Sequence, residues 1–285
     1  FKQKTAYEIM PSLVGSEMCI RDSFISGREL SYMRNHVLLN ALRLHFDVTV
    51  FTTGVRGIIA RTLTGLARFI ACRPDYDICF AGFYGQPIAI ALSVLQHKPI
   101  IFDAYVSTYD TLCEDRRWFH PDSPVGHLAY WLDRRSCQIA ARVITDTQAH
   151  ARYFAETFGI PKNKLVPVYV GCDETLFYPR DEVPADSRDF EVFYYGAFLP
   201  LHGTEVIVQA AALLRDRPEI HFTIGGDGMR RTVVQRMVAD LALTNVELVG
   251  WIPLEQLPDY IARASVCLGG HFSTIPKAAR VISTK

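Results

Sequence analysis

Two glycine-bearing turns in the second half of the chain have the residues best suited to bind a ligand. The apolar run 192–195 ends at Gly196, and Gly203 follows where the next helix is expected. A second apolar run ends in Gly226, Asp227 and Gly228. Such turns expose backbone N–H groups at the positive end of a helix dipole, and both features favour a diphosphate. Either turn alone is also explained by ordinary turn glycines, but together they predict a phosphate or nucleotide site at the ends of adjacent strands.

Three side chains that can carry positive charge lie beside these turns. His202 immediately precedes Gly203, and Arg230 and Arg231 follow the second turn. Arginine and protonated histidine bind phosphate oxygens through charge-assisted hydrogen bonds. The alternatives are a surface histidine that caps a turn and a solvated helix face that carries at least one arginine. All three residues are therefore candidates for binding the phosphate or nucleotide.

A second group of candidates lies in the first half of the chain. Asp103 ends the apolar segment 100–103, where its carboxylate can orient an acceptor hydroxyl or act as a catalytic base; a turn or N-cap aspartate is the alternative. Gly27 and Arg28 follow a short first strand, where the backbone can approach an acceptor. Tyr105 belongs to a polar and aromatic stretch that suits either stacking on a sugar or docking as a loop.

Other residues exclude several functions. The nine histidines have no H-x-x-x-H or H-E-x-x-H spacing, so we predict no metal site. Neither a G-x-S-x-G nor a G-x-x-x-x-G-K-[ST] motif occurs, which argues against a serine hydrolase and a P-loop ATPase. His150 is interpreted as a surface or internally satisfied histidine. One helix is expected to present either a solvated basic face or a contact for anionic lipid, through Arg56, Arg61, Arg68 and Arg73.

The composition is that of an ordinary globular protein. The chain has 285 residues, 49% hydrophobic and 21% charged, and its 30 acidic and 30 basic residues cancel. No net field therefore favours a nucleic-acid partner. The seven cysteines form no C-x-x-C pair, which predicts reduced thiols in a cytoplasmic protein. No apolar run approaches the ~18–20 residues that span a bilayer.

Hydrophobic periodicity predicts alternating strands and helices, hence parallel sheets covered by helices on both faces. Strands are expected at 24–27, 48–51, 77–81, 100–103, 142–146, 165–170, 191–195, 220–224, 246–249 and 265–268. Helices are expected at 31–45, 57–72, 87–96, 124–141 and 148–158, after residues 203 and 228, and near 253. Residues 1–23 are interpreted as a non-native or disordered leader. The acidic, proline-bearing stretch 180–189 is the best linker candidate, so domains are predicted at 24–180 and 181–285, the second incomplete.

Several segments resemble the retaining glycosyltransferases of family 4, which have the two-domain GT-B architecture. Residues 170–179, Val-Gly-Cys-Asp-Glu-Thr-Leu-Phe-Tyr-Pro, are similar to the family's interdomain segment, in which asparagine is usual at the first position. Residues 196–203 have the spacing of its donor-phosphate loop, and residues 224–228 resemble its next glycine turn. Residues 31–35, Ser-Tyr-Met-Arg-Asn, look like the acceptor domain of some members.

The chain departs from the family pattern at further places. Ala197 and His202 stand where many members have arginine and lysine. Gly270 falls near the first of two glutamates that gather the donor sugar, and the second would lie beyond Lys285. A histidine that often follows the fourth acceptor-domain strand is replaced around residues 102–103.

The resemblance implies an α/β fold of two doubly wound, Rossmann-like domains that face a cleft. It implies a hexosyl-type transferase that moves a sugar with retention from a UDP- or GDP-sugar to a hydroxyl of a carbohydrate or lipid-linked acceptor, without a further cofactor, as in cell-envelope polysaccharide synthesis. A cytoplasmic location with peripheral contact at the inner membrane face fits that activity. Catalysis is expected to require residues beyond Lys285. The alternatives are a non-catalytic sugar-nucleotide-binding GT-B protein and a sugar-nucleotide epimerase.

Overall fold

The structure, a computed structural model, describes residues 20–179 and 190–282. It divides into two compact units, of which unit 1 ends at Gly171 and unit 2 begins at Cys172. The division thus falls before the stretch 180–189 that we expected to be the linker. That stretch, and residues 1–19 of the expected leader, lie outside the described residues.

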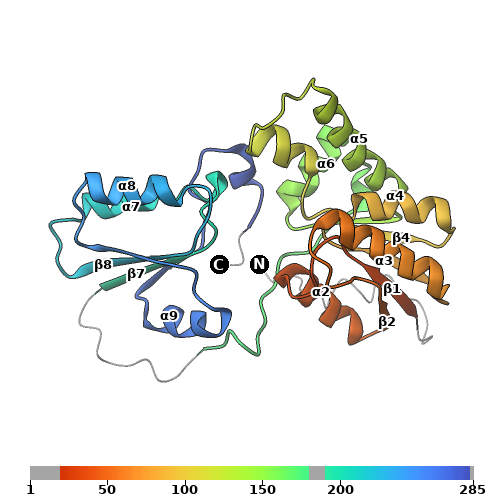
Figure 1. Ribbon diagram of the computed structural model, residues 1–285, viewed down its shortest axis with the longest axis horizontal. Helices are drawn as coiled ribbons and strands as arrows, with labels where there is room; N and C mark the ends of the chain where they lie inside the picture. Colours follow the sequence, from red (N-terminus) through yellow and green to blue (C-terminus); the bar gives the residue numbers. More distant parts are fainter. Residues whose placement is uncertain (1–19, 180–189, 283–285) are drawn as a thin grey trace. The chain divides into compact units, whose positions relative to one another are not determined.

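Unit 1 is built on a six-stranded sheet in which every pair of neighbouring strands is parallel (Figure 1). Its spatial order is β2-β1-β3-β4-β5-β6. The strands are β1 (Arg21–Ile25), β2 (Asp47–Val50), β3 (Ile78–Ala81), β4 (Ile100–Asp103), β5 (Arg142–Thr145) and β6 (Leu165–Pro167). The helices are α2 (Met33–Arg43), α3 (Ile58–Cys72), α4 (Gln86–Leu95), α5 (Pro124–Ile139) and α6 (Gln148–Phe158), with a π-helical turn η2 (Asp110–Asp115) before α5.

Two cores cover the two faces of this sheet, because successive strand residues point to opposite sides. Phe24 and Phe80 pack with the leucines of α2. Ile25 and Ala81, one residue further along their strands, pack with α3, α4, α5 and α6. Central parallel strands that are covered on both faces are rich in apolar residues, and β3 (Ile-Cys-Phe-Ala) has this pattern.

The first strand begins three residues earlier than expected. Residues 21–23, which we had grouped with the leader, form the first half of β1, and the side chains of Asp22 and Ser23 are buried. Among the described residues, neither Asp22 Oδ1 nor Ser23 Oγ has a hydrogen-bond partner. Burial, and secondarily the nearby charge of Asp77, raises the pKa of Asp22 to about 7. The start of β1 is therefore a locally unfavourable stretch of an otherwise apolar sheet.

Unit 2 is a four-stranded parallel sheet of order β10-β7-β8-β9. Its strands are β7 (Phe190–Tyr195), β8 (Ile220–Gly225), β9 (Val246–Val249) and β10 (Val266–Leu268), and its helices are α7 (Thr204–Leu213), α8 (Arg231–Asp240) and α9 (Leu257–Arg263). Val192, Tyr194 and Ile224 pack with α7 and α8, while Phe193 packs with Leu257 of α9 on the other face. The predicted fold class, two parallel α/β sheets, is confirmed.

The predicted elements are all present, and most differences are of a few residues at their ends. The strand at 100–103 and the helix at 148–158 have the predicted bounds, whereas the strand expected at 165–170 stops at Pro167. The last ladder bond of this strand is the Val168 N–H, which donates to the Thr145 carbonyl oxygen at 2.7 Å. Within the described part of the chain, no helix is long and apolar enough to cross a membrane.

Candidate functional site

The first glycine turn of unit 2 leads from β7 through a short 3-10 turn (Pro200–His202) into α7. Gly203, at the N-cap of α7, has a φ of 62°, a left-handed conformation that favours glycine. A Cβ at this position would also lie 2.5 Å from the backbone nitrogen of Ser273. Both the backbone angle and the close neighbour therefore require glycine, which explains the residue that the sequence pattern singled out.

The two glycine turns lie against each other at the same edge of the sheet. The Gly196 N–H donates to the Gly225 carbonyl oxygen at 3.1 Å, and the Phe198 N–H donates to the Asp227 carbonyl oxygen at 2.8 Å. Gly226 has a φ of 125°, and a Cβ there would lie 1.9 Å from the Gly196 carbonyl oxygen. The two turns are therefore one packed unit, so the predicted neighbourhood of the turns is present.

This edge combines the beginnings of two helices. The first backbone N–H groups of a helix have no acceptor within the helix, and the helix dipole places positive charge there. α7 begins at Thr204 and α8 at Arg231, each directly after its glycine turn. The arrangement is suited to an anionic group such as a diphosphate.

The three predicted cationic side chains are also at this edge, but each contacts the protein itself. Arg230 Nε donates to Glu205 Oε1 at 2.5 Å, in a partly exposed ion pair between α8 and α7. Arg231 Nη1 donates to the carbonyl oxygen of Gly226 and, at 3.2 Å, to that of Val249. Arg230 thus joins the second turn to α7, and Arg231 joins the same turn to the end of β9. Helical periodicity did not predict these roles.

His202 is buried rather than on the surface, and its ring connects two loops. Its Nδ1 contacts the Ala197 carbonyl oxygen, which fixes Nδ1 as the donor because a carbonyl oxygen only accepts. The His202 carbonyl oxygen accepts from the Phe272 N–H at 3.0 Å, and the rings of His202 and His271 lie 5.2 Å apart. His202 therefore holds the loop after β10 against the first glycine turn.

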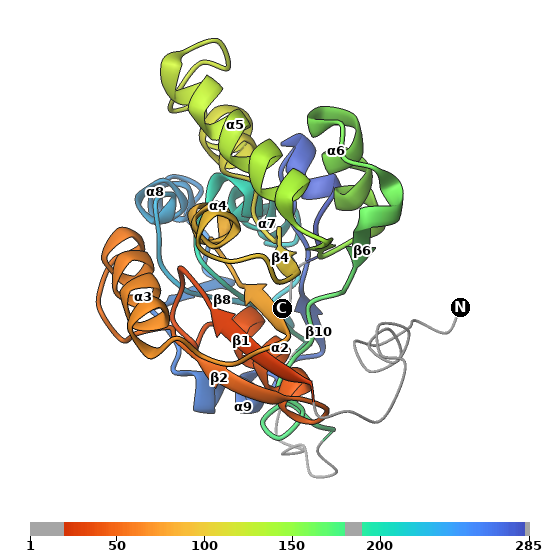
Figure 2. The same cartoon turned by 90° about the vertical axis from the view of Figure 1, so that its right-hand side faces the viewer.

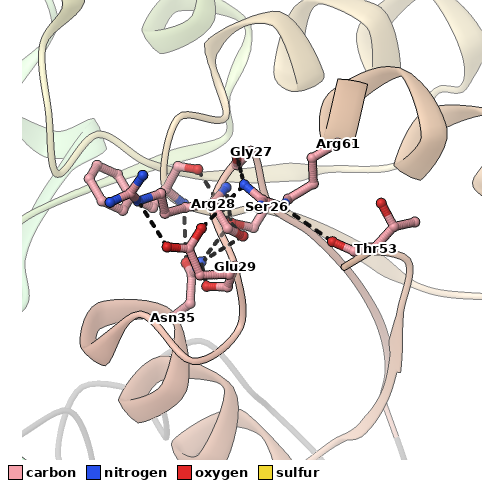
Figure 3. A network of polar contacts seen from close by, with 8 residues as sticks. Ser26, Gly27, Arg28, Glu29, Asn35, Thr53 and Arg61 are labelled. Atoms are coloured by element: carbon pink, nitrogen blue, oxygen red, sulfur yellow. Dashed lines mark hydrogen bonds and ion pairs between the residues drawn. The ribbon is translucent and has the colours of Figure 1, made fainter. Parts of the chain in front are cut away.

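In unit 1, the loop after β1 contains Gly27 and Arg28 and is held by buried polar side chains (Figure 3). Asn35 Nδ2 donates to Ser26 Oγ at 2.7 Å and to the carbonyl oxygens of Arg28 and Glu29 at 3.2 and 3.0 Å. Arg61, from α3, donates to the Gly27 carbonyl oxygen at 3.1 Å and pairs with Glu29 at 3.3 Å. The loop conformation is thus determined by side chains from two helices.

Aromatic rings connect this loop to the predicted acceptor tyrosine. The Arg28 guanidinium lies 5.2 Å from the centroid of the Tyr32 ring, and Tyr32 lies 4.8 Å from Phe83. The Phe83 ring meets Tyr105 edge-on at 5.1 Å. The carboxyl ends of β1, β3 and β4 therefore bring Gly27, Arg28 and Tyr105 into one cluster.

Asp103 is placed at the end of β4, as expected, but its carboxylate is fully engaged. Arg34 is 2% exposed and Asp103 1% exposed. Arg34 Nη2 and Nε donate to the two Asp103 oxygens at 2.8 and 3.3 Å, and Nη1 donates to the Val168 carbonyl oxygen at 2.8 Å. Burial favours a lower pKa for Arg34, but the attraction and hydrogen bonds of Asp103 outweigh it and raise that pKa. The Asp103 carboxylate is therefore part of a buried structural ion pair, and both of its oxygens are occupied by Arg34.

Asp133 organises the loop that follows Asp103. Its Oδ2 accepts from Ser107 Oγ at 2.7 Å and from the Tyr109 N–H at 2.8 Å, while Oδ1 accepts from the Thr108 N–H at 3.0 Å and from Gln86 Nε2 at 3.1 Å. Burial raises the pKa of Asp133, and these four hydrogen bonds oppose that shift. The loop that carries Tyr105 is therefore anchored by a carboxylate on α5.

Of the two interpretations of His150, the structure supports an interior histidine. Its Nδ1 lies 2.5 Å from Asp146 Oδ1, and both side chains are buried. Its ring also packs against Phe154, with centroids 5.0 Å apart. The i, i+4 spacing on and just before α6 was visible in the sequence, but nothing there showed that this side of α6 faces the interior.

Sequence reasoning did not identify the side chains that hold the loops of the unit 1 cluster in place. They are polar or charged side chains on helices that cover the sheet: Arg34, Asn35, Arg61 and Asp133. The burial of Arg61 could have been inferred from its position in α3. It precedes Gly65 by four residues and therefore lies on the same, buried side of the helix. We had placed it instead among the surface arginines of that helix, which was wrong.

Comparison with known proteins assigns the chain to a family. Residues 34–176 match the model of Glycosyltransferase Family 4, and residues 179–269 match that of Glycosyl transferases group 1. The chain belongs to glycosyltransferase family 4. The match to family 4 covers most of unit 1, which contains the Arg34–Asp103 pair, and the group 1 match covers the glycine turns of unit 2.

Curated members of similar sequence are distant. This family 4 chain is 30% identical over 118 residues, 38% of its own length, to a D-inositol 3-phosphate glycosyltransferase of Pseudarthrobacter chlorophenolicus, of which the match covers 28%. The matched stretches span about a third of the length of the curated relatives. The similarity thus places the chain in the family, while the activity of the whole protein is a matter for proposal.

Solved structures show the fold. Anabaena HepE in complex with UDP and glucose has a TM-score of 0.59 at 17% identity, with 90% of this chain and 75% of that one covered. A putative UDP-N-acetylglucosamine 2-epimerase from Listeria monocytogenes has a TM-score of 0.56 at 12% identity, covering 88% and 74%. The family 4 chain accordingly has a GT-B-like fold.

Proposed function

We propose that this protein transfers a hexosyl-type sugar from a nucleotide-diphosphate sugar to a hydroxyl group of an acceptor, with retention of configuration at the anomeric carbon. The donor is a UDP- or GDP-sugar, and UDP is favoured because HepE, a similar structure, was solved with UDP. The acceptor is a carbohydrate or a lipid-linked molecule, and the family supports a sugar-like or polyol hydroxyl because its curated relatives are glycosyltransferases of D-inositol 3-phosphate.

The packed pair of glycine turns in unit 2 is the observation that carries this proposal. The contact of Gly226 with Gly196 brings the beginnings of α7 and α8 to one edge. A leaving diphosphate gains negative charge as the bond to the sugar breaks, so pre-oriented N–H groups stabilise the transition state more than the ground state. Arg230 and Arg231, which lie at the same edge, add positive charge to the field there.

Acceptor binding is assigned to the cluster in unit 1 that contains Gly27, Arg28 and Tyr105. Arg28 is partly exposed and lies over the Tyr32 ring, so its guanidinium can hydrogen-bond to a hydroxyl or an anionic group. For Asp103 we propose a positioning role: by holding Arg34 it supports Tyr105, whose ring lies 5.3 Å from that guanidinium. The catalytic base expected at Asp103 is replaced in this proposal by a structural ion pair.

Calorimetry with UDP, GDP and UDP-glucose tests the donor assignment, and release of UDP from UDP-glucose in the presence of sugar acceptors tests the transfer. Heat with UDP that disappears in Gly226→Ala and persists in Gly250→Ala supports the site, because a Cβ at Gly250 meets no atom within 4 Å. Absence of heat with any of these nucleotides, from a chain shown to be folded by circular dichroism, would sink the proposal.

A second candidate function is non-catalytic binding of a sugar nucleotide. The ion pairs of Arg230 and of Asp103 favour it, because both engage groups that a transferase could use in its chemistry. Binding of UDP without turnover of UDP-glucose by any form of the protein distinguishes this function from transfer. Epimerisation at C2 of the donor sugar, monitored by NMR, distinguishes the epimerase alternative from both.

A further inference from the structure

A cavity of about 590 Å³ lies in unit 2, at the end of the sheet opposite to the glycine turns. It is bounded by the amino-terminal parts of β7, β8 and β9 and by α9, which Figures 1 and 2 show on the opposite side of the sheet from α7 and α8. Glu191, at this end of β7, precedes Gly196 by five residues, or about 17 Å along a strand. The cavity is therefore separate from the candidate donor site. We name it the α9 cavity, and its polar lining includes Glu191, His221, Thr223, Asn245, Glu247 and Arg263.

Strand register places the side chains of the α9 cavity in two rows on one face of the sheet. Glu191 of β7 pairs with His221 of β8. Two residues further along, Phe193 pairs with Thr223, and Thr223 pairs with Glu247 of β9. Residues two apart in a strand point to the same side of a sheet, and this is the side on which Phe193 packs with α9. The face therefore presents two carboxylates, an imidazole and a hydroxyl beside an aromatic ring.

Helix α9 adds an aromatic ring and a cation to the α9 cavity. The Tyr260 ring stacks on Phe193, with centroids 5.3 Å apart and an angle of 21° between the ring planes. Arg263, the last residue of α9, is exposed and lines the cavity as well. The two glutamates outnumber this arginine, so the charge of the cavity disfavours an anionic ligand such as a nucleotide or a phosphorylated sugar. A neutral ligand fits this lining better.

Two hydrogen-bond acceptors at the α9 cavity lack a donor. Glu191 Oε1 is buried, and no group among the described residues donates to it. Asn245 is 6% exposed, and its Nδ2 donates to the Ala211 carbonyl oxygen at 3.0 Å. Its Oδ1, however, has no partner in the part of the chain that the structure describes. Because a buried acceptor without a donor is costly, both oxygens favour a ligand that brings O–H or N–H groups.

We propose that the α9 cavity binds a neutral sugar, either free or as part of a saccharide chain. A sugar hydroxyl both donates and accepts, so hydroxyls can donate to Glu191 and Asn245 and accept from Arg263. The apolar side of a sugar ring can pack against the Tyr260 ring. The volume lies within the roughly 300–1,000 Å³ of small-molecule sites. An amine would also supply donors to the two acceptors, but it offers no acceptor to Arg263.

A sugar site at this place has a consequence for the transfer reaction. If the protein transfers sugars as proposed, the α9 cavity holds a saccharide chain on unit 2 outside the donor site and raises its effective concentration for the next transfer. This consequence rests on the proposed function, whereas sugar binding by the cavity does not.

Saturation-transfer difference NMR of the full chain tests sugar binding directly. The compounds are glucose, N-acetylglucosamine and maltose, compared with putrescine as an amine and alanine as an amino acid. Each is measured without UDP and with an excess of UDP, which fills the candidate donor site. We expect saturation of at least one sugar, unchanged by UDP, and none of putrescine or alanine. Sugar binding by a chain that gives no heat with UDP would support this inference and count against the proposed function.

Variants of the lining residues place the sugar in the α9 cavity. Glu191→Gln and Arg263→Gln should each weaken sugar binding roughly tenfold, because each removes a hydrogen bond to a charged group. Saturation measured over a series of sugar concentrations gives the affinities. The matched controls are Glu255→Gln and Arg236→Gln, exposed positions of unit 2 outside the cavity, which should bind sugar like the unaltered chain.

Four results would overturn the proposal: no saturation of any of the three sugars, loss of the sugar signal when UDP is added, saturation of putrescine or alanine in place of the sugars, or unchanged sugar affinity in both cavity variants. Circular dichroism melting of each variant shows whether it is folded. If Glu191→Gln unfolds, Arg263→Gln decides the outcome, because Arg263 is exposed and its loss leaves the core intact.

Discussion

At the scale of single residues, the structure changes the role of the most prominent acid. A carboxylate at the end of a buried strand has the position of a catalytic base, but Asp103 shares both oxygens with Arg34. Removing two charges from water is costly, and the cost is offset here by two hydrogen bonds to the carboxylate and a third from Arg34 to Val168. The pair is therefore sensitive to the loss of either member.

The change Asp103→Asn is expected to destabilise unit 1 by about 3–5 kcal/mol, because it leaves the Arg34 charge buried without a counter-charge. Urea unfolding of the variant measures this loss. The double variant Asp103→Leu/Arg34→Met should recover most of the stability, since it removes both buried charges. If Asp103→Asn is as stable as the unaltered chain but fails to transfer sugar, then Asp103 acts chemically and the positioning role is refuted.

At the scale of elements, turns and strand ends determine the sites. The glycine turns of unit 2 have backbone angles that other residues rarely adopt and neighbours that leave no room for a side chain. The loop after β1 is held by side chains from α2 and α3. Most such features are the consequence of parallel strands whose carboxyl ends meet at one edge. Two predictions concern these elements.

The change Gly226→Ala should destabilise unit 2 by about 2 kcal/mol or more, since it adds a left-handed backbone strain to a clash with the Gly196 carbonyl oxygen. UDP affinity should fall with it. Thermal unfolding and calorimetry measure the two effects. Gly250→Ala is the matched control and should differ from the unaltered chain by no more than about 0.5 kcal/mol. Equal stability of both variants would contradict the close packing of the two turns.

The change Asp22→Val should stabilise unit 1 at pH 8 by roughly 1 kcal/mol, because it removes a carboxylate that is buried without a full set of partners. The pKa of Asp22 in the folded chain, about 7, exceeds the reference value of 3.8. As the pH rises from about 4 to 7, the unfolded chain releases this proton before the folded chain does, so stability falls across that window.

Urea unfolding at a series of pH values from 4 to 8 checks this slope. The slope should be smaller in Asp22→Val and unchanged in Asp47→Asn, an exposed acid at the start of the neighbouring strand β2. A stability that rises between pH 4 and pH 7 to the same extent in all three proteins would show that Asp22 does not retain its proton in the fold.

At the scale of the whole molecule, each unit has its own sheet, core and candidate site. The proposed donor site lies in unit 2, at the ends of β7 and β8, and the proposed acceptor cluster lies in unit 1, at the ends of β1, β3 and β4. A ligand that binds only the native form of one unit stabilises that unit by mass action. A nucleotide that binds only unit 2 should therefore stabilise unit 2 and leave the stability of unit 1 unchanged.

Amide hydrogen exchange of the whole chain with UDP should show slower exchange at residues 196–205 and 225–231. At a UDP concentration of 100 times Kd, linkage adds about 2.7 kcal/mol to the stability of the unit that binds it. Residues 26–35 of unit 1 serve as the internal control and should exchange at an unchanged rate. Slower exchange at residues 26–35 alone would place the nucleotide in unit 1 and refute the proposed donor site in unit 2.

The sequence alone determined the alternation of strands and helices, the parallel sheets and the positions of the glycine turns. These features follow from local pattern: period-two and period-3.6 hydrophobicity, and the backbone angles that only glycine adopts easily at Gly203 and Gly226. These patterns involve residues that are close together in the chain, so they can be recognised without knowledge of long-range contacts.

Only the tertiary structure decided which polar groups meet. Arg34 and Asp103 are 69 residues apart in the chain, and Arg61 reaches a carbonyl oxygen 34 residues away. A helical pattern shows that one side of a helix faces the interior, but not which groups it contacts there. The sequence analysis therefore placed Arg61 on the surface and did not identify Arg34 as the partner of Asp103. Desolvation favours such pairings in the interior, because burying a charge without a partner is costly.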